Sequence, residues 1–287
     1  MEETIRISVR ELVAFSFFQP DILPAADASA MLAGTRAHQA RQAQTDAQIE
    51  KSIKHMYEVD GLSLLVFGRM DAYTDGDVPL IEEIKLAHDA PDAPLPEHRA
   101  QALCYAAMLA LEKPCERVRF SVCYVEEGGR VLASFEEEHT EAELSAEMDD
   151  LLKPYAAFAA REQRHRMRRD ETLRAMSFPF DGYRKGQREL AVQVYTAISR
   201  RKRLFASLPT GTGKSAAVLF PALKALGEGK ADQVLYLTAR NTARQSPLNA
   251  LQRMTNRGMK ARCCVLTAKE KLCPAPTRCH PDRKSVV

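Results

Sequence analysis

The chain has 287 residues, of which 45% are hydrophobic and 28% are charged. This is long enough for two domains with separate cores, and neither low complexity nor an internal repeat interrupts the sequence. A formal net charge of +3 excludes a strong global field, so any affinity for nucleic acid must come from local basic patches, at 161–169 and 200–203. The sequence lacks an apolar run of bilayer length, and its seven cysteines have no framework spacing, so we expect a soluble cytoplasmic protein with reduced thiols and no membrane contact.

The first part of the chain alternates strands and helices. A strand at 4–7 precedes the capping box Ser8-Val9-Arg10-Glu11, which predicts a helix to Phe18. The other expected elements are a helix from about residue 27 that carries His38, a hairpin of strands at 62–73 and 78–86, a helix at 97–111, a second hairpin at 118–125 and 131–135, and a helix at 141–172. This order predicts one α/β domain over residues 1–172.

Two carboxylates are expected to meet in the first hairpin. Asp71 lies at the end of one strand and Glu83 on the next, and Glu83 shares a strand face with Lys85, whereas the neighbouring Glu82 does not. Two carboxylates with a backbone carbonyl can hold Mg²⁺ or Mn²⁺, and a lysine beside them can orient water or stabilise developing charge. The pattern therefore predicts metal-assisted hydrolysis of a phosphodiester, with Asp71, Glu83 and Lys85 as catalytic residues.

Three further residues extend this site. His38 would add a nitrogen ligand, which favours Mn²⁺ over Mg²⁺. Gln101 and Tyr105 lie four positions apart on one face of the helix at 97–111, where they can meet a DNA backbone. With the order of elements, these residues resemble the RecB-like branch of the PD-(D/E)XK nucleases, through its His, Gly-x-x-Asp, Glu-x-Lys and Gln-x-x-x-Tyr motifs. The resemblance covers residues 1–170 and implies a nuclease fold with His38, Asp71 and Glu83 as metal ligands.

A second domain is expected over residues 173–287, after a turn-rich stretch at 178–183. The pattern predicts helices at 188–199 and 216–226 and strands at 203–208, 233–238 and 261–267. A strand, a helix and a further strand form a βαβ unit, so we expect part of a RecA-like domain with a parallel sheet.

The run from Leu208 to Ser215 is the most specific motif of the chain, because it places Gly-x-Gly-Lys-Ser between an expected strand and an expected helix. The glycines turn backbone N–H groups toward phosphate oxygens, Lys214 supplies a positive charge, and Ser215 offers a hydroxyl to Mg²⁺. The predicted nucleotide contacts are Pro209, Thr210, Gly211, Thr212, Gly213, Lys214 and Ser215. Leu208 replaces the leading glycine of the general pattern, and this resembles the phosphate loop of superfamily 2 helicases more than that of GTPases or small-molecule kinases.

Several flanking residues resemble elements of the DinG/XPD-like helicases. Arg184 and Gln187 match an Arg-x-x-Gln element near the nucleotide. The segment with Thr238, Arg240 and Asn241 resembles one that grips the phosphates of single-stranded DNA, and an ordinary strand-to-helix cap is the alternative. Cys273 and Cys279 resemble the start of an iron–sulfur insertion. Because a 4Fe-4S cluster needs four thiolates, we expect one only in a longer parent protein, and a zinc site with His280 would be equally incomplete.

The sequence as a whole predicts the N-terminal portion of an ATP-dependent DNA helicase and nuclease, truncated in the first helicase lobe and unable to unwind DNA alone. Its expected partners are ATP, Mg²⁺ or Mn²⁺, and DNA with single-stranded regions or ends. Two alternatives stay open: a non-catalytic DNA clamp with a nucleotide-sensing phosphate loop, and a small ATPase or kinase unrelated to DNA. Strand polarity, pathway and oligomeric state are not determined by the sequence.

Overall fold

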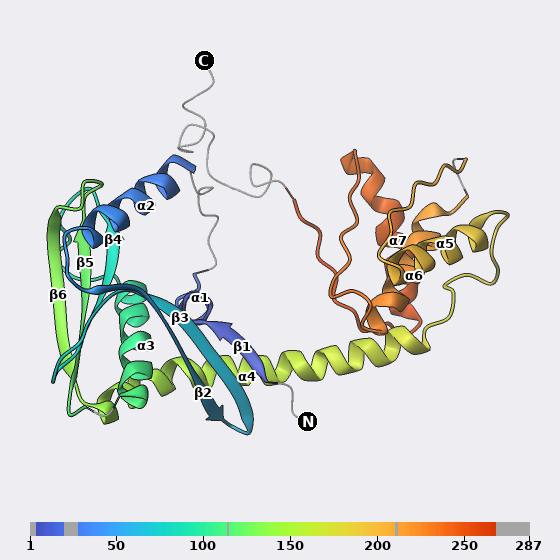
Figure 1. The fold of residues 1–287 in the computed structure, drawn as a ribbon. Coiled ribbons are helices and arrows are strands. Elements are labelled where there is room, and N and C mark those ends of the chain that lie inside the picture. The colour runs from blue at the N-terminus through green and yellow to red at the C-terminus, as the bar shows by residue number, and fades with distance from the viewer. Residues whose placement is uncertain (1–3, 20–27, 114, 210–211, 268–287) are drawn as a thin grey trace, which may run out of the picture. The chain divides into compact units, whose positions relative to one another are not determined.

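The computed structural model describes residues 4–19, 28–113, 115–209 and 212–267. The chain is mixed α/β, and its described residues divide into two compact units, one within residues 4–160 and the other Arg161–Leu266 (Figure 1). The division falls inside a long helix, α4 (Glu141–Ala175), and the boundary predicted after residue 172 lies in the same helix.

The first unit is built on a six-stranded sheet with the order β1-β3-β4-β5-β6, in which β2 also pairs with β3. Its elements are β1 (Ile5–Ser8), α1 (Val9–Ser16), α2 (Ala28–Gln42), β2 (Gln48–Val59), β3 (Leu62–Thr74), β4 (Leu80–Leu86), α3 (Pro96–Glu112), β5 (Val118–Val125), β6 (Val131–His139) and the first part of α4. The pairs β1–β3 and β4–β5 are parallel, and the other pairs are antiparallel. Helix α3 makes the crossover that a parallel β4–β5 pair requires.

Helices cover the two faces of the sheet. Helix α3 is buried from Ala100 to Ala110 and shares the main hydrophobic core with β3, β4 and β5. On the other face, Ala37 of α2 packs in a smaller cluster with Ile84 of β4 and Cys123 of β5. Strand β4 is therefore buried on both faces, and consecutive residues of β4 face different helices.

The capping box at the start of α1 is confirmed, since Ser8 accepts the Glu11 amide and the Glu11 carboxylate accepts the Ser8 amide. Strand β2 was not predicted. It begins at Gln48, after the helix expected from residue 27 ends at Gln42. In β2, buried or half-buried residues alternate with exposed ones, and the inward-facing residues are Ile53, His55, Tyr57 and Val59. This is the period of two that a strand requires.

The second unit is helical in its described residues. It contains the end of α4, α5 (Gln187–Ser199), α6 (Lys214–Gly227), the 3₁₀ helix η1 (Asn241–Arg244) and α7 (Gln245–Asn256). Leu173 of α4, Leu219 and Leu223 of α6, and Met254 of α7 form its core.

The parallel sheet predicted for this unit is not observed among the described residues. The segments 203–208, 233–238 and 261–267 form neither helix nor strand there. Their apolar side chains stay largely in solvent, with 94% exposure for Phe205, 90% for Leu237 and 87% for Leu266. A strand is stabilised by ladder partners and by packing on its faces, and the core of this unit is made chiefly by the helices instead.

Candidate functional site

The two predicted catalytic carboxylates lie on neighbouring strands of the first unit. Ala72 of β3 pairs with Glu82 of β4, so the antiparallel register brings Asp71 next to Glu83. Both side chains are buried, with 5% exposure for Asp71 and none for Glu83. Buried carboxylates are uncommon unless they are paired or bind a metal.

Glu83 is held by one lysine and is otherwise short of partners. Its Oε1 accepts a hydrogen bond of 2.7 Å from Lys85 Nζ, and Lys85 also donates to Gln101 Oε1 at 3.0 Å. Glu83 Oε2 is buried and has no hydrogen-bond partner among the described residues. Burial and the nearby charge of Asp71 raise the pKa of Glu83 to about 7, against the opposing effect of Lys85.

Asp71 has a different environment, which favours its charged form. Its Oδ1 lies 3.5 Å from His38 Nδ1, and its Oδ2 accepts the Ile84 amide at 2.9 Å. Burial acts to raise the pKa of Asp71, but the contacts with His38 and Ile84 outweigh burial and lower it. The same hydrogen bond to Asp71 raises the pKa of His38 and outweighs the desolvation of the imidazole. The pKa of Glu83 is thus raised and that of Asp71 is lowered. Such a separation of two neighbouring carboxylates is common at catalytic sites.

The structure separates Glu83 from Glu82. Glu82 forms a bidentate pair with Arg41 of α2, with both contacts at 2.9 Å, on the face opposite Lys85. Glu82 is therefore occupied by a structural ion pair, whereas Glu83 retains an oxygen with no partner.

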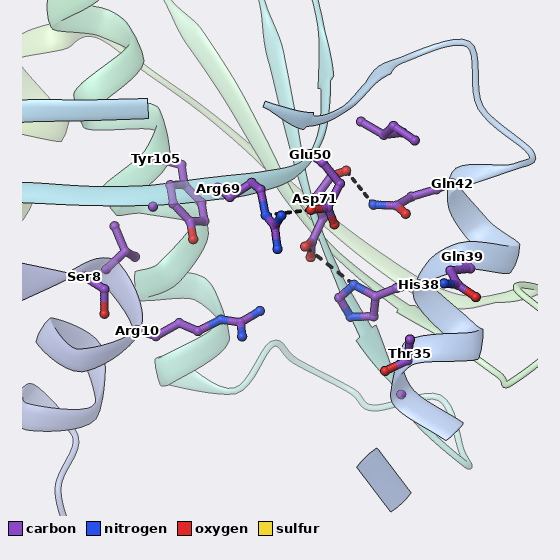
Figure 2. A pocket seen from close by; sticks show the side chains of 14 residues that line it. Ser8, Arg10, Thr35, His38, Gln39, Gln42, Glu50, Arg69, Asp71 and Tyr105 are labelled. Atoms are coloured by element: carbon purple, nitrogen blue, oxygen red, sulfur yellow. Dashed lines mark hydrogen bonds and ion pairs between the residues drawn. The ribbon is translucent and has the colours of Figure 1, made fainter. Parts of the chain in front are cut away.

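Asp71 and His38 lie beside a cleft of about 610 Å³ in the first unit (Figure 2). Residues of α1, α2, β2, β3 and α3 line it, among them Arg10, Arg69, Glu50 and Tyr105. Arg69 pairs with Glu50 at 2.6 Å. This volume is within the range of small-ligand sites in proteins.

Of the five residues predicted to contact DNA, the two on α3 are buried. Gln101 is 6% exposed and binds Lys85, and Tyr105 is 2% exposed and lies under Gly68. Burial raises the pKa of Tyr105 to about 12, so its hydroxyl stays protonated. In this arrangement Gln101 orients Lys85, and Tyr105 supports the strand that leads to Asp71.

The predicted three-residue metal site is not assembled as such. Among the described residues, no group of three or more His, Cys, Asp or Glu side chains is arranged to hold a metal ion. His38 contacts Asp71, whereas Glu83 turns to Lys85. The chemistry of the donor set still fits a hard cation, because Mg²⁺ commonly binds proteins through one or two carboxylates and completes its shell with water and substrate phosphate.

In the second unit, the phosphate loop leads into α6. Gly213 has φ 75°, the left-handed conformation that favours glycine, and it caps the helix. Lys214 Nζ donates to the carbonyls of Leu208 and Pro209 at 2.8 and 3.1 Å. The Thr212 hydroxyl also donates to Pro209, at 3.0 Å. The loop carbonyls thus occupy the lysine that is predicted to bind phosphate.

Gln187 connects α5 to the phosphate loop. Its Nε2 donates to the Gly213 carbonyl at 3.0 Å, and its Oε1 accepts the Arg184 amide at 2.9 Å. Ser215 is 9% exposed and contacts Tyr236 and Ser246 through hydroxyls at 3.2 and 2.9 Å.

The remaining predicted residues of this half are only partly described. The exposed Thr238 hydroxyl donates to the Arg240 carbonyl at 3.3 Å, and Asn241 begins η1. A second cleft of about 410 Å³ lies beside Ser215 and is lined by α6, η1 and α7, including Thr242 and Arg253. Thr210, Gly211, Cys273, Cys279 and His280 lie outside the described residues.

Arg10 and Gln42 line the cleft but are not among the residues predicted for the site. Arg10 belongs to the predicted capping box, and the second position of a helix that follows a strand can project into a neighbouring cleft. Gln42 Nε2 donates to the Asp71 carbonyl at 2.9 Å. No local pattern could have identified Gln42, because its partner lies on a different element.

The comparisons with known proteins concern mainly the second unit. Residues 187–274 match the family model described as DEAD/DEAH box helicase. This match supports a superfamily 2 helicase-type domain, for which binding and hydrolysis of ATP with Mg²⁺ and binding of nucleic acid are expected. The family model does not support the predicted iron–sulfur cluster.

A search of the curated proteins finds no match. A solved structure described as "Crystal structure of SSO0001" is similar with 20% identity and a TM-score of 0.35, covering 53% of this chain and 77% of that chain. That TM-score is too low to carry any argument about the fold. None of the described helices is both long enough and apolar enough to span a bilayer.

Proposed function

We propose that this chain belongs to a DNA-processing ATPase in which the first unit hydrolyses phosphodiester bonds and the second unit binds ATP. The observation that carries the nuclease proposal is the buried, unpartnered Oε2 of Glu83, next to Asp71 and Lys85. A buried polar atom without a partner costs about 1–3 kcal/mol. A site with such an atom is poised for a ligand that the protein alone does not supply.

The two carboxylates would hold Mg²⁺ or Mn²⁺, and His38 would assist. The metal would supply Lewis-acid activation of water and of a phosphate oxygen. Ligands must be deprotonated, so Glu83 has to lose its proton, which its pKa of about 7 allows near neutral pH.

Lys85 is placed to act on the substrate. Its ammonium donates to Glu83 and Gln101 in this geometry, which leaves one of its three N–H groups for another acceptor. A phosphate oxygen gains negative charge as water adds to phosphorus and the bond to the leaving oxygen breaks. A fixed ammonium beside that oxygen stabilises the transition state more than the ground state.

Hydrolysis of a labelled single strand with Mn²⁺ tests this function. We expect cleavage by the wild-type chain and a rate at least about 100-fold lower for Glu83→Gln. Glu82→Gln should change the rate little, because Glu82 pairs with Arg41 on the other face of the strand. Equal rates for all three proteins would exclude the proposed site.

One observation favours the second candidate, a non-catalytic DNA clamp. The described residues contain no assembled group of three metal-ligating side chains. A clamp predicts tight binding of the strand with no cleavage in any divalent ion. The same assay separates the two functions, because the clamp leaves the labelled strand intact.

For the second unit, the DEAD/DEAH match and the Gly213-Lys214-Ser215 run support ATP as the nucleotide. The more specific DinG/XPD-like identity stays a proposal. It rests on sequence resemblance alone, at Arg184 and Gln187, at 238–241, and at Cys273 and Cys279. Gln187 joins the phosphate loop to α5 by hydrogen bonds, so its side chain would reorganise when nucleotide enters. Titration with a fluorescent ATP analogue, competed with GTP, tests the choice of nucleotide.

A further inference from the structure

We infer that Arg10 binds a backbone phosphate of single-stranded DNA in the cleft of the first unit and thereby positions the strand against Asp71 and Glu83. This inference rests on the proposed nuclease function and adds a substrate-positioning residue to it. Neither the sequence motifs nor the family match assigns a role to Arg10.

Among the described residues, Arg10 is the cation of this cleft for which no anionic partner is found. Three cationic or titratable basic side chains line the described cleft: Arg10, His38 and Arg69. His38 lies 3.5 Å from Asp71, and Arg69 lies 2.6 Å from Glu50. Arg10 is exposed and takes part in none of the hydrogen bonds or ion pairs between described residues.

The local sequence explains why Arg10 stays available. The adjacent carboxylate, Glu11, accepts hydrogen bonds from the Ser8 amide at 3.0 Å and from the Ser8 hydroxyl at 2.7 Å. These contacts close the capping box and direct Glu11 back to the start of α1. Glu11 therefore caps the helix and does not neutralise its neighbour.

The direction of the side chain fits a substrate contact. Figure 2 shows Arg10 reaching into the cleft from α1, toward the side where His38 of α2 and Asp71 of β3 lie. A guanidinium is planar and always charged, and its fork of donors matches two oxygens of a phosphate. A phosphate between Arg10 and the carboxylates would have a positive group on one side and the proposed metal on the other.

The size of the cleft is compatible with a single strand. A volume of about 610 Å³ suits a short stretch of extended nucleotides. Phosphate contacts of this kind fix the position of the chain without reading its sequence. The inference therefore predicts binding that depends on salt and little on base composition.

The experiment measures the affinity of the full chain for a short labelled single strand in Ca²⁺, which occupies oxygen ligands without supporting cleavage, over a range of salt concentrations. We expect Arg10→Ala to weaken binding about tenfold or more and to reduce the slope of log affinity against log salt by about 1. Arg10→Lys should recover part of the affinity. The matched control is Arg117→Ala, which removes an exposed arginine paired with Glu138 at 3.1 Å and should change affinity less than about twofold.

A kinetic arm in Mn²⁺ distinguishes positioning from folding. Arg10→Ala should raise KM more than it lowers kcat, with unchanged thermal unfolding, because the side chain is exposed and forms no hydrogen bond or ion pair with the described residues. Unchanged affinity and salt slope in Arg10→Ala would overturn the inference, even if cleavage still depends on Glu83. Absence of binding by the wild-type chain would also overturn it.

The proposed function fails separately. If the wild-type chain binds the strand through Arg10 but cleaves nothing in Mn²⁺, the nuclease assignment is wrong and the Arg10 contact still holds.

Discussion

The ionisation of Glu83 can be tested through the pH dependence of stability. Glu83 has a pKa of about 7 in the folded chain, compared with 4.5 in its ordinary state. The folded state therefore keeps a proton that the unfolded state loses, and the associated stabilisation disappears as pH rises from about 4.5 to 7. The difference in pKa corresponds to about 3 kcal/mol. Glu83→Gln removes this titration, so the variant does not lose this stabilisation as pH rises. Its free energy of unfolding, measured relative to wild type, should therefore be about 2–3 kcal/mol higher at pH 8 than at pH 5.

Hydrogen exchange in the full chain can measure this change locally. Peptides that cover β4 report the free energy of opening around Glu83, and the intrinsic pH effect on exchange cancels when both proteins are compared at the same pH. The control is Glu82→Gln, which lies on the adjacent position but breaks a pair with Arg41. This variant should lose up to about 1 kcal/mol of stability. The difference in stability between this variant and wild type should be nearly the same at pH 5 and at pH 8.

A divalent ion should act in the opposite direction on the wild-type chain. At a free Mn²⁺ concentration of about 100 times Kd, binding to the folded state adds about 2.7 kcal/mol of stability, and Glu83→Gln should remove most of this gain. If the difference between Glu83→Gln and wild type is flat between pH 5 and pH 8, Glu83 does not hold a proton near neutral pH. The burial argument for the site would then be refuted.

Four further substitutions test other parts of the structure. Gly68→Ala places a methyl carbon 2.6 Å from the buried ring of Tyr105, so we expect a loss of about 1–3 kcal/mol in stability, measured by denaturant unfolding. Lys214→Ala should abolish detectable ATP binding in a titration with a fluorescent analogue, because no other group in the described loop supplies a charge for the phosphates. Leu237 is 90% exposed and Leu219 is 2% exposed. Leu237→Asp should therefore leave stability nearly unchanged, whereas Leu219→Asp should prevent folding of the second unit. Equal effects of the two substitutions in circular dichroism melts would contradict the exposed placement of residues 233–238.

In the first unit, local patterns predict most of what positions the carboxylates. The hairpin and its period of two place Glu83 and Lys85 on one face of β4 and Glu82 on the other, as observed. The patterns do not determine which partners each carboxylate finds. The pairing of Asp71 with His38 depends on how α2 packs across the sheet. The position of the Arg10 side chain in the cleft depends on where α1 lies. Both are consequences of tertiary packing between elements far apart in sequence.

In the second unit, apolar content predicted strands that did not form a sheet. A short apolar run fits a buried strand only when other strands pair with both of its edges. In the described part of this unit, the three predicted segments form no regular strand and do not pair with one another. The two helices predicted at 188–199 and 216–226 correspond to α5 and α6, whereas α7 was not predicted. A helix satisfies its backbone hydrogen bonds internally and needs packing on one side only, so its local pattern is more informative.

The two candidate sites differ in how far they are prepared for a ligand. In the phosphate loop, Lys214 satisfies carbonyls of its own loop, so a nucleotide must first displace these hydrogen bonds before its phosphates gain the ammonium. In the first unit, Lys85 is fixed by Glu83 and Gln101 while a buried oxygen of Glu83 stays unpartnered, so a cation would gain a ligand without breaking a contact of that oxygen. Because preorganised sites lose less free energy on binding, the metal site of the first unit should form in the chain as it stands. High-affinity binding of ATP, in contrast, should require rearrangement of the loop between Leu208 and Lys214.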